Sequence, residues 1–217
     1  VVNYKYGQYI DGRLYVANVR LDPDGDAEDY DNFIIYSELL QPDILPIVNF
    51  IQIKDIQGGA ITGLAKIFSD LVVLCERGIY RLSIPSSNPA TFSLLEAEEN
   101  IGCIADNSVC QAMGTVFFAG ADHVYALDQN FIPKPITEPI KDVYQGTASL
   151  SSTRIIFDPK KQRLLCRFGS DRNNIYVLDL VRYATGQIVW NKMDMRAYPV
   201  DVIDIDEDLK TYTVTNT

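Results

Sequence analysis

The sequence is poor in the residues that form metal and catalytic centres. It contains a single histidine, a single tryptophan and four cysteines among its 217 residues. Zinc needs clustered ligands, and the cysteines form no CxxC pair, so their spacing argues against a zinc site. Cys75 and Cys166 lie within apolar runs, and we expect the cysteines to be buried free thiols.

Positive charge is scarce as well. The 19 lysines and arginines are outnumbered by 29 aspartates and glutamates, which gives a net charge of −10. A general nucleic-acid binder usually presents a basic patch to the phosphates. The overall field of this chain repels a polyanion instead, and only a local basic patch stays open as an alternative.

Long apolar runs are absent too. No run approaches the roughly 18 residues that a membrane-spanning helix needs, so no membrane span is expected. No charged segment followed by an apolar one opens the chain, so no signal peptide is expected. Because the first residue is Val1 rather than methionine, we expect either a processed chain or part of a longer protein.

One pattern recurs along the chain: an apolar run, a short break, and a second apolar run that contains a tyrosine. It is found in LVVLCERGIYRL, TVFFAGADHVYAL and RLLCRFGSDRNNIYVL. The tyrosines of this pattern, with one more upstream, are Tyr36, Tyr80, Tyr125 and Tyr176, and the intervals between them are 44, 45 and 51 residues. Periods of about 40 to 50 residues are typical of propeller blades or helical arrays.

The local chemistry favours strands over helices. The apolar runs are short, rich in Val, Ile, Phe and Tyr, and separated by Gly, Pro, Asn and Asp. We therefore predict an all-β chain, a β-propeller with about four four-stranded blades. This propeller, or propeller portion of a longer chain, spans residues 1–217, with blades at roughly 1–56, 60–100, 104–137 and 150–205. The second strand of each unit is almost continuously apolar, as expected of a strand that is covered on both faces.

Two segments refine this architecture. TEPIKDVYQG, residues 137–146, has a capping Thr, a first-turn Pro-Ile and a closing Gly, which predicts one short helix. The acidic end, DVIDIDEDLKTYTVTNT, resembles the start of another strand pair. Four units would close a small ring or form an arc of a larger one, and the extra strand pair favours the arc.

The acidic segment DPDGDAEDYD, residues 22–31, is a candidate calcium loop. Asp22, Asp24 and Asp26 alternate and offer oxygen ligands. The loop departs from the EF-hand pattern, because Gly25 is fourth rather than sixth and Phe33 stands where Glu is needed. The alternative is a solvated hairpin tip. The acidic run from Asp201 to Asp208 also has two interpretations: it is a solvated face, or it lines a negatively charged channel.

No catalytic or cofactor-binding residues are predicted. His123 lies in the turn ADHVY without a nucleophile motif, and we interpret it as a turn residue. A carboxylate pair for glycoside hydrolysis stays open because carboxylates are abundant, although the Ser-x-Asp-x-Gly boxes of sialidase propellers are missing. The four recurring tyrosines are predicted to pack in the core or between blades, whereas Trp190 and other tyrosines leave a carbohydrate or protein contact open.

The order of these segments resembles the propeller of tail hub or nozzle proteins of tailed bacteriophages, also called packaged-DNA stabilisation proteins. The resemblance covers roughly residues 33–205. It rests on the hairpin in ITGLAKIFSDLVVLCERGIYRL, the Ile-Gly-Cys of ENIGCIADNSVC, the Pro-Ile in FIPKPITEPIKDVYQ, and the ending in NNIYVLDL with IVWNKM.

This resemblance implies a non-enzymatic virion protein in the phage tail, assembled in the host cytoplasm. Copies would form a ring below the portal and adaptor, around the DNA exit channel, and would retain the genome and dock other tail proteins. DNA would pass without specific binding, consistent with the acidic balance. Two alternatives are a host-receptor or glycan-binding propeller and a propeller hydrolase or lyase, which would need converging carboxylates.

Overall fold

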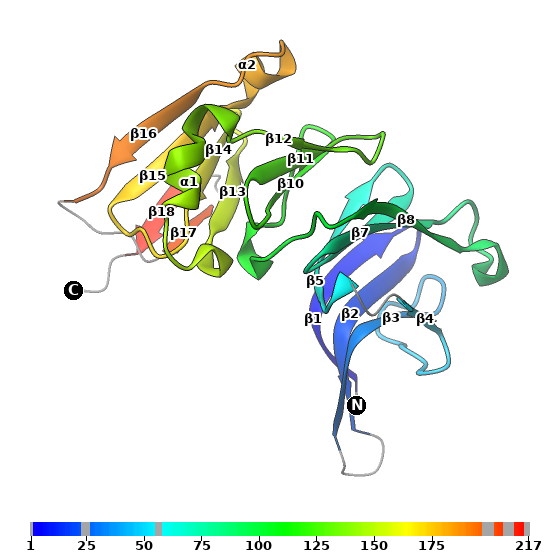
Figure 1. Cartoon of the computed structure of the whole chain (residues 1–217). Helices are drawn as coiled ribbons and strands as arrows, with labels where there is room; N and C mark the ends of the chain where they lie inside the picture. The colour runs from blue at the N-terminus through cyan, green and yellow to red at the C-terminus, as the bar shows by residue number, and fades with distance from the viewer. Residues whose placement is uncertain (1, 23–26, 55–57, 197–201, 206–210, 215–217) are drawn as a thin grey trace. The chain divides into compact units, whose positions relative to one another are not determined.

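The chain folds into antiparallel sheets that follow one another in sequence (Figure 1). A computed structural model describes residues 2–22, 27–54, 58–196, 202–205 and 211–214, and gives side chains up to residue 196. The chain forms two compact units. Unit 1 comprises Val1–Cys103 with Asp128–Ile132, and unit 2 comprises Ile104–Leu127 with Pro133–Thr217.

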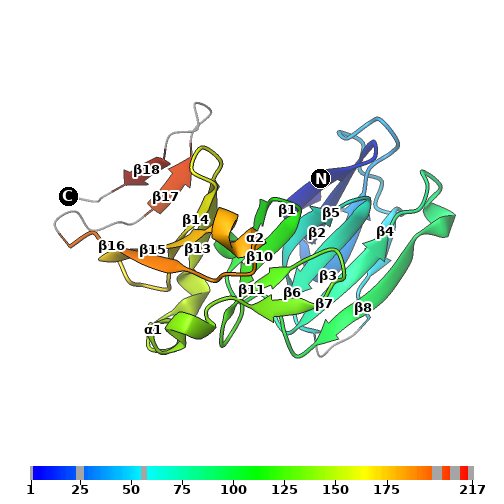
Figure 2. The same cartoon turned by 90° about the horizontal axis from the view of Figure 1, so that it is seen from above.

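Unit 1 contains two four-stranded sheets, each with its strands in sequence order (Figure 2). The strands of the first sheet are β1 (Val2–Ile10), β2 (Arg13–Leu21), β3 (Glu28–Tyr36) and β4 (Phe50–Gln52). Those of the second sheet are β5 (Ile61–Ile67), β6 (Asp70–Cys75), β7 (Gly78–Ser83) and β8 (Ser93–Glu99), and the 3-10 helix η2 (Pro89–Thr91) precedes β8.

Unit 2 contains two more four-stranded sheets and a two-stranded one. The first sheet has β9 (Cys110–Ala112), β10 (Thr115–Ala119), β11 (Val124–Leu127) and β12 (Pro133–Pro135). The second has β13 (Arg154–Asp158), β14 (Arg163–Arg167), β15 (Asn174–Asp179) and β16 (Trp190–Asp194). The two-stranded sheet pairs β17 (Val202–Ile205) with β18 (Thr211–Val214). The helices are η3 (Asp106–Ser108), η4 (Glu138–Ile140), α1 (Lys141–Gln145), η5 (Leu150–Ser152) and α2 (Leu180–Ala184).

The expected all-β architecture of four four-stranded sheets is confirmed. The helix expected over residues 137–146 is present as η4 followed by α1. A second five-residue helix, α2 (Leu180–Ala184), begins at the end of the NNIYVLDL segment and adds to the one short helix expected from the sequence. The Asp179 carboxylate caps it by accepting hydrogen bonds from the backbone N–H groups of Val181 and Arg182, a signal readable in the sequence.

The strand pair expected in the acidic end is also present. β17 and β18 pair antiparallel, and β17 lies beside β13. The same neighbour relation joins β5 to β1 in unit 1 and β13 to β9 in unit 2, so β17 takes the place of the first strand of a further sheet.

The sheets are stabilised by packing against each other. In unit 1, Tyr15, Ala17 and Ile34 of the first sheet form one cluster with Val73 and Cys75 of the second. All six residues of β6 are buried, although successive side chains point to opposite faces of a strand. This strand is therefore covered on both faces, which explains its continuous apolar sequence.

Unit 2 repeats this arrangement. Phe117 of β10 and Leu164 of β14 belong to one buried cluster between the two sheets. Leu165, the next residue along β14, belongs to a second cluster with Val177, on the opposite face of its sheet. Alternate residues of β14 thus serve two different cores.

The four recurring tyrosines pack as predicted. Tyr80, Tyr125 and Tyr176 are buried and Tyr36 is half-buried. Tyr80, Tyr125 and Tyr176 lie near the start of the third strand of their sheets and pair with residues near the end of the second strand. Tyr36 differs, because it is the last residue of β3 and pairs with Tyr15 near the start of β2. The aromatic ring of Tyr176 stacks on that of Phe168 with centroids 4.7 Å apart. The repeated tyrosine is therefore a packing residue.

All four cysteines are buried thiols, as expected. Burial raises the pKa of the Cys110 thiol from its ordinary value of 9.0 to about 12. Between these values an unfolded chain releases the proton that the folded chain keeps, so the free energy of unfolding is expected to fall as the pH rises above about 9.

Urea unfolding at about pH 8 and about pH 10.5 measures this loss. Cys110→Ala is expected to be less stable at both pH values because it leaves a cavity, but to lose less stability between them than the parent chain. An equal loss in both proteins would contradict the assignment to this thiol.

Candidate functional site

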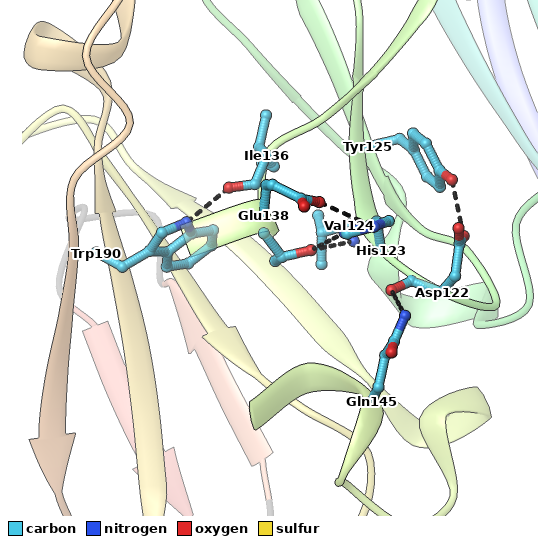
Figure 3. A network of polar contacts seen from close by, with 9 residues as sticks. Asp122, His123, Val124, Tyr125, Ile136, Glu138, Gln145 and Trp190 are labelled. Atoms are coloured by element: carbon cyan, nitrogen blue, oxygen red, sulfur yellow. Dashed lines mark hydrogen bonds and ion pairs between the residues drawn. The ribbon is translucent and has the colours of Figure 1, made fainter. Parts of the chain in front are cut away.

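A connected set of polar contacts surrounds His123, in the turn between β10 and β11 (Figure 3). The imidazole is buried, with Nε2 lying 3.3 Å from a carboxylate oxygen of Glu138 and Nδ1 lying 3.1 Å from the hydroxyl of Thr137. The Tyr125 hydroxyl donates to the Asp122 carboxylate at 2.7 Å, and the Gln145 amide donates to the Asp122 carbonyl. These bonds join the β10–β11 turn to η4 and α1.

Two further bonds extend the same set. The Tyr144 hydroxyl of α1 donates to the Gly120 carbonyl at 2.7 Å. The Trp190 indole N–H of β16 donates to the Ile136 carbonyl at 2.8 Å. The first bond joins α1 to the β10–β11 turn, and the second joins β16 to the residue that precedes Thr137 and η4. The network therefore fastens the two four-stranded sheets of unit 2 to the helical connection between them.

Glu138, His123 and Thr137 contact one another as the acid, imidazole and hydroxyl of a catalytic triad do, but their geometry is that of a structural contact. A nucleophile must be within reach of substrate, and Thr137 is completely buried. Its hydroxyl oxygen also accepts the backbone N–H of Val124 at 3.0 Å. His123 is thus a turn residue, as the sequence indicates, but the sequence does not reveal its burial or its partners.

The acidic segments named in the sequence analysis are only partly described by the structure. Asp22 is exposed after β2, whereas Asp24 and Asp26 lie outside the described residues, and the calcium site remains a prediction. Side chains of the run from Asp201 to Asp208 also lie outside the described part. Among the residues that are described, no group of three or more His, Cys, Asp or Glu side chains has the arrangement of a metal site.

Exposed apolar side chains of unit 1 gather in the connection between β3 and β4 and at Phe50, the first residue of β4, and we call residues 38–50 the apolar loop. Val48 is 82% exposed and Leu40 is 74% exposed. Large apolar side chains gathered at one exposed place commonly mark an interaction surface. Its other exposed apolar residues are Leu39, Ile44, Ile47 and Phe50.

Hydrogen bonds hold the apolar loop in a defined shape. The Leu40 N–H donates to the Gly12 carbonyl at 2.7 Å, and the Glu38 N–H donates to the Ile44 carbonyl at 3.0 Å. The Asn49 amide donates to the Glu38 carboxylate at 3.1 Å. A loop with a fixed shape loses little conformational entropy on binding, so this surface is suited to contact with another protein.

No pattern in the sequence marks this surface. Its residues, ELLQPDILPIVNF, lie within the predicted first blade, and apolar letters alone do not distinguish a buried segment from an exposed one. Within the described part of the chain, no helix is long and apolar enough to span a bilayer.

Comparisons with known proteins identify the fold. No protein-family model matches the sequence, and no curated protein does. Among solved structures, the chain is similar to the extracellular domain of a one-component system from B. thetaiotaomicron (TM-score 0.55, 14% identity), streptogramin B lyase (0.52, 12%) and BamB from Moraxella catarrhalis (0.50, 8%). The fold is a β-propeller.

The matched regions differ greatly in how much of each protein they cover. They include 94%, 97% and 94% of this chain, but only 24%, 60% and 62% of the three similar chains in the same order. This chain therefore spans less than two thirds of the length of each of these three chains. At these low identities, the comparison establishes the propeller fold alone.

Proposed function

We propose that this propeller is a structural, non-enzymatic component of a phage tail, placed at the tail hub or nozzle. It assembles as a ring of copies that retains the packaged genome and docks neighbouring tail proteins. The proposal rests first on the resemblance of residues 33–205 to hub and nozzle propellers. The structural observation that carries it is the apolar loop, a fixed and exposed apolar surface on a rigid blade.

The size and position of the apolar loop support an assembly role. Protein interfaces have an apolar, well-packed centre, and Leu40 and Val48 supply such a centre on unit 1. The loop follows β3, and both β3 and its neighbour β2 contain buried residues, so the loop extends from a rigid base. Rigid presentation lets identical copies repeat one contact around a symmetric ring.

The charge of the chain supports the placement near passing DNA. A net charge of −10 repels phosphates at a distance, which favours passage without retention on the wall. The proposed partners are therefore copies of this chain, the portal and adaptor, and other tail proteins, with DNA as a transient neighbour.

Imaging of the virus particle tests the proposal. Particles from a phage that encodes this chain are purified, the chain is detected by mass spectrometry, and its position is determined by electron microscopy with a specific antibody. We expect several copies in a ring at the tail. Recovery of the chain only outside particles would overturn the proposal.

A pair of variants tests the role of the apolar loop in the same phage. Val48→Glu places a charge at the centre of the proposed contact and is expected to reduce the yield of DNA-filled particles at least about tenfold. Phe68→Glu is the matched control, because Phe68 is 72% exposed and lies outside the loop. Equal particle yields from the two variants would remove the apolar loop from the assembly.

A further inference from the structure

The last strand of each four-stranded sheet has an edge with which no other strand of the described residues pairs. These strands are β4, β8, β12 and β16. A free edge presents backbone N–H and C=O groups to which a strand of another chain can bind. β4 and β12 have three residues each, and β12 contains two prolines, which have no N–H to donate. Of these four strands, β8 with seven residues and β16 with five therefore have the longest free edges.

The free edge of β8 is acidic. Its sequence, SLLEAEE, contains three glutamates and no basic residue. Glu96, Glu98 and Glu99 lie together, because they line one open groove. Among the side chains that the structure describes, neither Glu98 nor Glu99 has a basic partner in an ion pair. The Leu95 side chain is 51% exposed on the same strand. A strand that binds to this edge would therefore meet negative charge and an apolar side chain.

The sheet that ends in β16 is the basic part of the chain. Residues 150–196 contain nine lysines and arginines against four aspartates and no glutamate. Residues 1–103 have the opposite balance, with seven lysines and arginines against fifteen aspartates and glutamates. On β16 itself, the Asp194 carboxylate is paired with Arg196. Lys192 is exposed and forms no ion pair within the described part of the chain, so its charge is available to a partner.

These charges select the partner of β8. Pairing β8 with β8 of another copy would place glutamates beside glutamates, which is unfavourable. The edge of β18 contains no charged residue. β16 combines the Lys192 ammonium with Met193, a side chain that is 41% exposed, and both match what β8 presents. The net charge of −10 repels two copies at long range, but within a Debye length of about 10 Å the local charges dominate.

We infer that β8 of one copy of this chain pairs with β16 of a second copy, so that one four-stranded sheet continues into another. The contact joins two different surfaces, and such a contact can be repeated from copy to copy around a ring. The inference deepens the proposed function and rests on its claim that copies of this chain associate. It uses residues separate from the apolar loop.

Chemical cross-linking between two differently tagged variants tests this contact. Leu95→Cys is mixed with Met193→Cys and treated with a short bismaleimide, to which the native cysteines are inaccessible because they are buried. We expect a mixed dimer of the two variants, since pairing of the strands raises the effective concentration of the two thiols. Met113→Cys replaces Met193→Cys as the matched control, because Met113 is 56% exposed and lies outside β16. The control is expected to give at least about tenfold less mixed dimer.

A charge exchange tests the electrostatic part of the inference. Adding Lys192→Glu to the Met193→Cys variant is expected to reduce the yield of mixed dimer about fivefold, because like charges then face each other. Adding Glu98→Lys and Glu99→Lys to the Leu95→Cys variant is expected to restore the yield. Circular dichroism checks that every variant is folded, and the restoration separates lost attraction from a damaged strand.

Three results would overturn the inference: no mixed dimer, equal yields with Met193→Cys and Met113→Cys, or cross-linking of Leu95→Cys mainly to itself. The experiment uses the isolated 217-residue chain, so it can fail independently of the particle imaging. A ring at the tail without this cross-link would remove the β8–β16 contact alone. The cross-link in a chain that is absent from particles would instead remove the placement in a phage tail and keep the contact.

Discussion

Replacing Gly102 with alanine is expected to destabilise unit 1 by about 3 kcal/mol. Gly102 is buried, and a Cβ atom there would overlap the Cys75 carbonyl oxygen and the backbone nitrogen of Arg77. The segment cannot simply move away, because the adjacent Cys103 N–H donates to the same Cys75 carbonyl at 2.8 Å. The added methyl group therefore breaks this contact or strains the β6–β7 turn.

Urea unfolding followed by far-UV circular dichroism measures the effect. Gly7→Ala is a matched control in the same unit, since its Cβ would lie 3.4 Å from the Tyr4 ring, an ordinary contact. The control is expected to change the free energy of unfolding by less than about 0.5 kcal/mol. If both variants unfold at the parent midpoint, the close approach at Gly102 does not constrain the fold.

Gly102 also shows where sequence reasoning reaches its limit. The Ile-Gly-Cys segment is noticeable in the sequence as part of a resemblance, but nothing local explains the glycine. The reason is a contact with residues 75–77, which lie about 25 positions earlier in the chain. Close approach between distant segments depends on tertiary packing and has no local pattern.

The strands themselves were predictable because their signals are local. Apolar runs such as the one in β6 alternate between two faces, and turn residues separate them at short intervals. The recurrence of Tyr80, Tyr125 and Tyr176 was sufficient to predict stacked, equivalent sheets, since a repeated packing residue implies a repeated environment. The fold therefore followed from periodicity.

The candidate surfaces were not predictable in the same way. Val48 and Leu40 have the same apolar character as core residues, and only the structure shows that they are exposed. The contacts of His123 with Thr137 and Glu138 likewise join a turn to a later helical segment, and no local pattern marks them. Function depends on these juxtapositions, whereas the fold depends on patterns within single segments.

Replacing Phe168 with alanine is expected to destabilise unit 2 by about 4 kcal/mol. The side chain is completely buried, and its ring lies between those of three neighbours. The centroid distances are 4.7 Å to Tyr176, 5.1 Å to Tyr144 and 6.0 Å to Trp190. Truncation removes this packing and leaves a cavity among rigid rings that cannot collapse to fill it.

Trp190 is a specific reporter for this experiment because it is the only tryptophan in the chain and contacts Phe168 directly. Its fluorescence during urea unfolding is expected to change at a lower midpoint in Phe168→Ala. Phe68→Ala, at a phenylalanine that is 72% exposed, is expected to leave the free energy of unfolding within about 0.5 kcal/mol of that of the parent chain. Equal midpoints for the two variants would mean that the cluster around Phe168 contributes little to the stability of unit 2. The sheets of this unit would then depend mainly on their strand hydrogen bonds, contrary to the packing described here.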